Sequence, residues 1–203
     1  MRLTDDENVQ INRYVDLSAK ANHARPCPLD KTPTAWSTLN ATSDPVTQDV
    51  LATNLAWMHD HSQELPLHTV LVDEGWQSKV GDWLTVDKVR FSDGMAGLAG
   101  KIAAEGHEPG LWLAPFVAQA GSSLCANHPD WFVRDASGRP INVVERWGGP
   151  CYALDLTNEA VLEWLQRIIH TVVADWGFRY LKLDLLRYGS AFSVVSGFWK
   201  VCR

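Results

Sequence analysis

Lys182 and Asp184, two positions apart, are the residues of this chain best placed to do chemistry. Both belong to the stretch Tyr180-Leu-Lys-Leu-Asp184, whose alternation predicts a strand with the charged side chains on one face. The other face carries leucines that can pack against helices: Leu181, Leu183 and Leu185. Buried lysine and aspartate tend to mark functional sites. The pattern favours a barrel strand that delivers catalytic groups to the barrel mouth. A buried ion pair inside an α/β core is the alternative.

Adjacent carboxylates, Asp73 and Glu74, end a second apolar run and are followed at once by Gly75 and Trp76. Two carboxylates at a strand end can accept hydrogen bonds from sugar hydroxyls, hold a metal ion or begin a solvated loop. A tight turn followed by an aromatic ring is typical of a pocket wall. We therefore expect Asp73, Glu74 and Trp76 to bind a ligand.

The sequence allows two roles for each of two other tryptophans, Trp83 and Trp112. Asp82-Trp83 after Gly81 repeats the pairing of acid and ring, but a loop around a buried tryptophan explains it equally well. Trp112 lies between two leucines of a strand-like run, so its ring lies on the opposite face from theirs. That face is either the mouth or interior of a barrel, or packed core.

Motifs for metal ions, phosphate groups and acyl transfer are weak in this sequence. His59-Asp-His61 lies at the polar end of a helix without further ligands at a recognisable spacing, so we expect surface residues. The glycine-containing segment at residues 94–101 fails the phosphate-loop pattern. The cysteines are scattered and predict free thiols in a reducing compartment: Cys27, Cys125, Cys151 and Cys202. We expect no metal and no cofactor.

Composition narrows the class of protein. The chain has 203 residues, 46% of them hydrophobic and 21% charged, as in soluble globular proteins. A net charge of -6 without a basic cluster argues against nucleic acid as a partner. No apolar run approaches the ~18 residues of a membrane helix, and the polar N-terminus does not resemble a signal peptide. We therefore expect a cytoplasmic protein with no membrane partner.

Ten tryptophans are an unusually high number for a chain of this length, and flat aromatic rings with one N–H donor suit a sugar ligand.

Strand-like and helix-like stretches alternate, which predicts parallel βα units. Residues 1–30 read as an irregular lead-in, 31–192 as the main domain and 193–203 as a divergent tail. The expected strands cover residues 34–38, 68–73, 109–115 and 180–185, with a short extended piece at 151–155. The expected helices start at 43–45, at 92–94 and near 161, and a long excursion with a turn at Ser137-Gly138 fills 116–150. Acidic and aromatic residues then gather at the carboxyl ends of the strands, where α/β proteins bind ligands.

Six motifs in order resemble glycoside hydrolase family 36, the α-galactosidases with raffinose-synthase-like relatives. They are Val70-Leu-Val-Asp-Glu-Gly-Trp76, Gly81-Asp-Trp83, Pro109-Gly-Leu-Trp-Leu-Ala-Pro115, His128-Pro-Asp-Trp131, Tyr152-Ala-Leu-Asp155 and Tyr180-Leu-Lys-Leu-Asp184. The resemblance implies a TIM-type (β/α)8 barrel, here cut to about four βα units, and an α-galactoside oligosaccharide as substrate. It also implies a retaining mechanism, in which one carboxylate attacks the anomeric carbon and another acts as acid and then base.

The resemblance assigns roles to individual residues. Asp184 matches the nucleophile, and Lys182 matches a lysine that binds substrate hydroxyls and keeps the aspartate ionised. Asp73 and Glu74 match an Asp-Asp pair that holds galactose hydroxyls, and Trp112 matches a binding-site tryptophan.

Three departures from the family pattern shape what we expect of the chain. Glu74 replaces an aspartate, and Gly149 stands where an arginine is common, with Arg146 as a candidate substitute. No residue matches the acid/base aspartate, so we expect a truncated or frameshifted fragment, weakly active or inactive, that self-associates through open strand edges. A non-catalytic remnant or sugar-binding half-barrel is the alternative function, and a complete flavodoxin-like open sheet is the alternative architecture.

Overall fold

The computed structural model describes residues 6–24, 34–39 and 46–190, in two compact units that divide after Pro33. The first unit contains helix α1 (Glu7–Ala21). Its cap is Asp6, whose carboxylate accepts hydrogen bonds from the N–H groups of Asn8 and Val9, and Glu7 and Lys20 suit the helix dipole at its two ends. The expectation of an irregular lead-in is therefore wrong for these residues. The expected tail at 193–203 lies outside the described residues.

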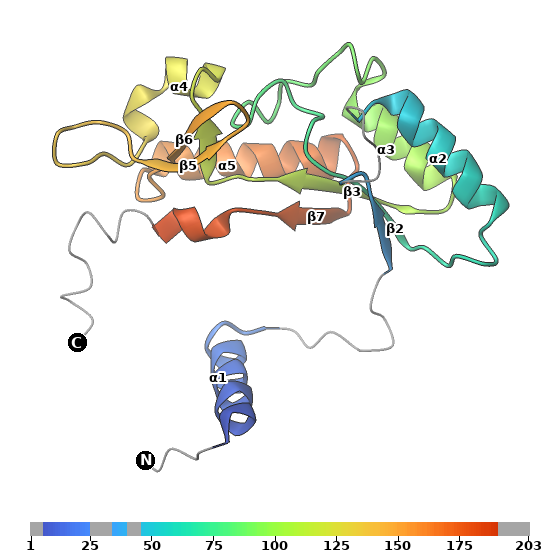
Figure 1. Ribbon diagram of the computed structural model, residues 1–203, viewed down its shortest axis with the longest axis horizontal. Helices are drawn as coiled ribbons and strands as arrows, with labels where there is room; N and C mark the ends of the chain where they lie inside the picture. Colours follow the sequence, from blue (N-terminus) through green and yellow to red (C-terminus); the bar gives the residue numbers. More distant parts are fainter. Residues whose placement is uncertain (1–5, 25–33, 40–45, 191–203) are drawn as a thin grey trace. The chain divides into compact units, whose positions relative to one another are not determined.

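A parallel sheet of four strands forms the centre of the second unit (Figure 1). The strands β1 (Ala35–Ser37), β2 (Thr69–Val72), β3 (Glu108–Leu113) and β7 (Tyr180–Leu183) lie side by side in chain order. Their register pairs Val72 with Leu111 and Leu113 with Leu183. All four strands therefore end at the same edge of the sheet. In the described part of the chain the sheet is open, not closed into a ring.

Three helices alternate with these strands, as the hydrophobic spacing predicts. Helix α2 (Gln48–Asp60) is capped by Thr47, and α3 (Gly94–Ala104) follows Asp93. The expected start of α2 at residues 43–45 lies outside the described residues. The inward faces of α2 and α3 join the strands in one core and carry Leu51, Leu55, Met58, Met95, Leu98 and Ile102.

Helix α5 (Glu159–His170) differs from its expected form in its last turns. It continues as one π-helical segment (Thr171–Asp175), which rotates the following side chains relative to an α-helix. Val161, Ile168 and Val172 are buried, whereas Leu162 and Val173 are exposed. The expected apolar face of α5 is therefore only partly correct.

The segment between β3 and α5 folds into a small antiparallel sheet. Its strands are β4 (Val117–Gln119), β6 (Gly149–Ala153) and β5 (Asn142–Arg146), in that order across the sheet. Helix α4 (Ser123–Asn127) and a 3-10 turn (Pro129–Trp131) lie between β4 and β5 in the chain. The expected turn at Ser137-Gly138 is confirmed, since Gly138 N–H donates to the Asp135 carbonyl. The expected extended piece at 151–155 is confirmed in part by β6.

Strand β7 is shorter and less covered than its sequence predicts. It ends at Leu183, and Leu185 has a left-handed backbone (φ 55°) instead of an extended one. Leu185 is buried, but Leu183 is 42% exposed. The expectation that all three leucines pack against helices is wrong for Leu183, which stays largely exposed at the edge where, in the described residues, β7 pairs with β3 alone.

No helix in the described residues combines the length and apolar character needed to cross a bilayer.

Candidate active site

The carboxyl edge of the parallel sheet brings together the charged residues expected there. Asp73 and Glu74 follow β2 directly, Lys182 lies in β7, and Asp184 follows the last residue of β7. Lys182 Nζ lies 2.8 Å from Asp73 Oδ2, so the ammonium group reaches across the position of β3 to the end of β2. The ion pair therefore joins Lys182 to Asp73, where the sequence had suggested a pairing with Asp184.

Asp73 is held by hydrogen bonds at its backbone N–H and at both carboxylate oxygens. It is 2% exposed; its backbone N–H donates to Thr38 Oγ1 (2.8 Å), and Ser37 Oγ donates to its Oδ2 (3.4 Å). The other oxygen, Oδ1, accepts a hydrogen bond from Glu74 N–H at 2.9 Å. These contacts fix the direction of the carboxylate and of the Lys182 ammonium that pairs with it. Thr38 and Ser37, at the end of β1, are site residues that sequence reasoning missed, because hydroxyl residues in a short strand give no distinctive signal.

Asp184 is held by two N–H donors, one at each carboxylate oxygen. Trp112 Nε1 donates to Oδ2 at 3.2 Å, and the backbone N–H of Leu185 donates to Oδ1 at 2.7 Å. The left-handed conformation of Leu185 accompanies the second bond. Such a conformation costs a bulky residue about 1–3 kcal/mol and is found where surrounding contacts enforce it. Leu185 is only 8% exposed, so the contacts around its buried side chain hold its backbone in this conformation.

The environment of Asp184 favours its ionised form. Partial burial on its own raises the pKa of this carboxyl group. The N–H groups of Leu185 and Trp112 and the positive charges of Lys182 and Arg146 oppose that effect and prevail, so the pKa of Asp184 lies below its usual value. Asp184 is therefore a carboxylate at neutral pH, oriented by two donors at the end of a strand.

Four tryptophans form a chain of ring contacts beside these carboxylates. Centroid separations are 6.1 Å from Trp76 to Trp83, 5.7 Å from Trp83 to Trp112, and 6.1 Å from Trp112 to Trp147. The first three rings are at most 2% exposed. Trp76 Nε1 donates to the Trp112 carbonyl at 3.0 Å, so its one donor is used within the fold. In this structure Trp76 supports Trp112 from within the core, and a direct role in ligand binding stays a prediction for both.

The tip of the β5–β6 hairpin supplies two further residues to the site. Trp147 Nε1 donates to Glu74 Oε2 at 2.8 Å, and a guanidinium nitrogen of Arg146 lies 3.6 Å from the same oxygen. Trp147 is half-buried and packs against the main core. Arg146, a candidate on sequence grounds, does reach the site, whereas Trp147 was not among the expected site residues. The signal available for it was an aromatic residue in the long excursion, directly before two glycines.

Comparison with known proteins agrees with this geometry. The family model described as Melibiase matches residues 36–192. This chain belongs to the melibiase family. The resemblance to glycoside hydrolase family 36 is thereby confirmed.

Curated and solved relatives of this melibiase-family chain include several α-galactosidases. Alpha-galactosidase AgaA of Geobacillus stearothermophilus is 30% identical over 132 residues, which make up 62% of this chain and 17% of the relative. Alpha-galactosidase 2 of Pediococcus pentosaceus is 29% identical over 136 residues, or 64% and 18% of the two chains. TtGalA, the α-galactosidase of Thermus thermophilus, was solved with p-nitrophenyl α-D-galactopyranoside and matches 92% of this chain and 38% of its own, with 34% identity and a TM-score of 0.74. The chain thus spans less than half the length of these relatives.

Other charged motifs of this melibiase-family chain lie apart from the strand-end carboxylates. His59 pairs with Glu105 (3.0 Å) and His61 stacks on Trp57, all on or near exposed helix surface. Asp82 accepts hydrogen bonds from the N–H groups of Ser123 and Leu124, both at 3.0 Å. Of the two readings of Asp82-Trp83, these contacts and the burial of Trp83 favour the structural one.

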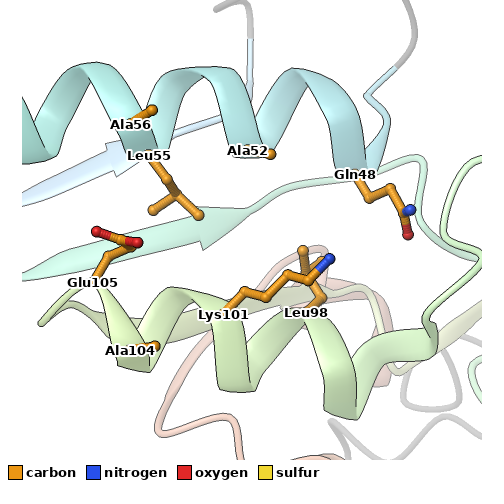
Figure 2. Close-up of a pocket in the computed structure, with 8 residues that line it drawn as sticks. All are labelled: Gln48, Ala52, Leu55, Ala56, Leu98, Lys101, Ala104 and Glu105. Carbon is orange, nitrogen blue, oxygen red and sulfur yellow. The ribbon is translucent and has the colours of Figure 1, made fainter.

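A hollow of about 290 Å³ between α2 and α3 is also separate from the carboxylates (Figure 2). Its floor consists of alanine and leucine side chains, with Lys101 and Glu105 at the rim. Each of these rim residues already has a polar side-chain partner, Asp93 for Lys101 and His59 for Glu105. Among the residues with described positions, no group of histidine, cysteine and carboxylate side chains is arranged to hold a metal ion.

Proposed function

We propose that this chain carries the nucleophile and part of the sugar-binding site of a retaining α-galactosidase, built on the first four βα units of a (β/α)8 barrel. The observation that carries the proposal is Asp184, ionised and oriented at the end of β7, with the Lys182–Asp73 ion pair beside it. Glycosidases of this class need such a carboxylate next to groups that bind hydroxyls.

The strand order supports a barrel over the flavodoxin-like alternative. The order β1-β2-β3-β7 follows the chain, so each crossover moves one position in the same direction across the sheet. A doubly wound sheet reverses direction at a switch point, and a barrel does not. The similarity to TtGalA, over 92% of this chain, supports the same architecture.

In the proposed complex the sugar lies over the carboxyl edge of the sheet. Asp73 and Glu74 accept hydrogen bonds from its hydroxyl groups, and Lys182 donates to a hydroxyl oxygen while still paired with Asp73. These charge-assisted bonds hold the ring in one orientation. The neighbouring solved enzyme was captured with p-nitrophenyl α-D-galactopyranoside and with stachyose, which supports an α-galactoside as the ligand class.

In the proposed reaction an oxygen of Asp184 attacks the anomeric carbon. The new C–O bond forms as the bond to the leaving oxygen breaks, and the leaving oxygen takes that electron pair and a proton from a general acid. Water then attacks the anomeric carbon of the glycosyl–Asp184 ester and gives its proton to the conjugate base of that general acid, while Asp184 departs again as a carboxylate. Lys182 and the two N–H donors favour the anionic form both at the start and at the end. No residue of this chain matches the family's acid/base aspartate, so we assign the proton transfer to none of its residues.

Sugar binding without turnover is the second candidate function, and the unmatched acid/base residue favours it. Calorimetry with stachyose, alongside assays with p-nitrophenyl α-D-galactopyranoside, separates the candidates. We expect the 203-residue chain to bind stachyose but not maltotriose. We also expect it to hydrolyse the nitrophenyl galactoside slowly or not at all, because a general acid contributes about 10²–10⁴-fold in rate. Equal affinity for both oligosaccharides contradicts an α-galactoside site, and rapid turnover lost in Asp184→Asn contradicts the missing acid.

A further inference from the structure

The two-residue turn between β5 and β6 places a tryptophan where the backbone conformation favours asparagine or glycine. Arg146 pairs with Gly149, so Trp147 and Gly148 form a two-residue turn, and both have positive φ (55° and 82°). Turns of this kind favour Asn-Gly or Gly-Gly, because bulky side chains are strained in the left-handed region. The turn therefore does not explain why a tryptophan occupies the position. Strained residues of this sort concentrate at functional sites.

Contacts made by Trp147 explain how the strained conformation is maintained. Its carbonyl accepts a hydrogen bond from Gln119 Nε2 (2.6 Å), and its ring packs edge-on against Trp112. Its indole Nε1 donates to Glu74 Oε2 at 2.8 Å. Trp112 in turn donates to Asp184. The side chain of Trp147 thus touches a neighbour of the candidate nucleophile and one of the candidate sugar-binding carboxylates.

The Glu74 side chain needs a neighbour such as Trp147 to fix its position. Unlike Asp73, it is not buried, and a glutamate side chain has one more rotatable bond than aspartate. Both of its described polar side-chain contacts, from Trp147 and from Arg146, are made by Oε2. The other oxygen, Oε1, has no hydrogen-bond donor among the described residues. One oxygen is therefore anchored to the hairpin, and the other is available to a ligand.

We propose that Trp147 is a positioning residue for sugar recognition, and that it acts by fixing Glu74 so that Oε1 meets a hydroxyl of the terminal α-galactosyl unit. Arg146, exposed and 3.6 Å from Oε2, holds the Glu74 carboxylate on the hairpin side. The inference rests on the proposed α-galactoside site and adds to it a residue that links the antiparallel hairpin to substrate selection.

A double-mutant cycle on the 203-residue chain tests whether Trp147 acts through Glu74. Affinity for stachyose is measured by calorimetry for the unchanged chain, Trp147→Phe, Glu74→Ala and the double variant. Trp147→Phe keeps a ring but loses the indole N–H. We expect each single change to weaken binding about tenfold, the usual effect of losing a hydrogen bond to a charged group. The double variant should bind about as weakly as Glu74→Ala alone, because Trp147 then has no carboxylate to fix.

Two further variants separate positioning from folding. Trp147→Asn gives the turn a residue that its geometry prefers, so it should keep the hairpin yet still weaken stachyose binding about tenfold or more. Trp57→Phe changes a tryptophan on α2 that is 51% exposed and lies apart from the site, and should leave affinity unchanged. Unfolding temperatures are recorded for every variant.

Each outcome bears on the proposal. Coupled effects at Trp147 and Glu74, without a matching fall in unfolding temperature, support it. Additive effects, unchanged affinity in Trp147→Phe and Trp147→Asn, or losses of affinity that simply follow losses of stability overturn it while leaving the galactoside site intact. If the unchanged chain fails to bind stachyose, the proposed function falls and the positioning role falls with it.

Discussion

At the scale of single residues, the site depends on which N–H groups point at which carboxylate. Asp184 has one donor for each oxygen, and Asp73 has a lysine on one oxygen and a backbone N–H on the other. The side-chain contacts, from Trp112 to Asp184 and from Lys182 to Asp73, join strands far apart in the sequence. The indole of Trp112 is the side-chain donor whose removal changes Asp184 most selectively, since its Nε1 donates to Asp184 Oδ2.

Replacing Trp112 by phenylalanine should raise the pKa of Asp184 from its lowered position toward the usual 3.8. The indole N–H stabilises the anion, and phenylalanine cannot donate. A carboxyl group whose pKa is lower in the folded than in the unfolded protein stabilises the fold above the unfolded-state pKa. That stabilisation is lost as the pH falls through the folded-state pKa. The variant, in which the folded-state pKa is higher, should therefore lose it at a higher pH than the unchanged chain. Carboxyl carbon NMR during an acid titration measures the shift.

The matched control for that titration is Trp57→Phe, which changes an exposed ring on α2 and should leave the titration of Asp184 unaltered. An Asp184 pKa that stays in place or falls in Trp112→Phe contradicts the role given to the indole.

Residue types and spacing were enough to predict Asp73, Glu74, Lys182 and Asp184 at one edge, because strand ends in parallel sheets converge. The partner of Lys182 was not predictable. It depends on the register of β7 against β3 and on the distance across β3 to Asp73, neither of which a local pattern encodes. Trp147 escaped prediction for the same reason: its contact with Glu74 joins positions 73 residues apart.

At the scale of elements, the strands and helices with strong periodicity agree with their sequence patterns. The exceptions have physical causes. Helix α1 contains several apolar residues but buries none of them, and the signal of its Asp6 cap is weak without a buried face. Strand β7 ends early because Leu185 turns into the left-handed region beside Asp184. The small antiparallel sheet consists of short strands whose pairing depends on distant partners.

Two glycine substitutions should have opposite effects on stability, one where β3 closely approaches β2 and the other within α3. A Cβ on Gly110 would lie 3.3 Å from the Leu71 Cα and 3.2 Å from Thr69 Cγ2, so Gly110→Ala should push the two strands apart and destabilise the protein by about 1–3 kcal/mol. Gly100 lies within α3 with nothing near its added Cβ, so Gly100→Ala should stabilise it by about 0.5–1 kcal/mol. Urea unfolding of both variants measures these changes.

One result of the urea unfolding would contradict the prediction for Gly110→Ala. If Gly110→Ala is as stable as the unchanged chain, the packing of β2 on β3 is looser than described, and the placement of Asp73 relative to β7 loses its rigid basis.

At the scale of the whole molecule, the open edges of the parallel sheet are the dominant feature. Among the residues whose positions are described, strand β7 pairs on one side only, and its exposed residues include Tyr180 (37%) and Leu183 (42%). Exposed apolar strand edges template pairing with other chains. We therefore propose that the chain self-associates through β7. A cytoplasmic location stays a prediction from the sequence.

Leu183→Lys should reduce that association, because a charge on an edge strand disfavours strand pairing. Sedimentation velocity over a range of concentrations should show the unchanged chain forming larger species, and the variant remaining closer to a monomer. Val89→Lys is the matched control, since Val89 is 95% exposed and lies in a loop away from the strand edges. Equal association in both variants, or an unchanged chain that stays monomeric throughout, contradicts a role for β7.

The central claim, that Asp184 is a nucleophile, is tested most directly by covalent trapping. An α-galactosyl fluoride with a second fluorine at C5 suits this test, because fluoride leaves without a proton from a general acid and the C5 fluorine slows release of the glycosyl–enzyme ester. Intact-mass and peptide mass spectrometry then locate the adduct. We predict a single galactosyl adduct on Asp184 that is absent in Asp184→Asn and present in Trp57→Phe. An adduct on another residue, or none in a chain that binds stachyose, would contradict the account.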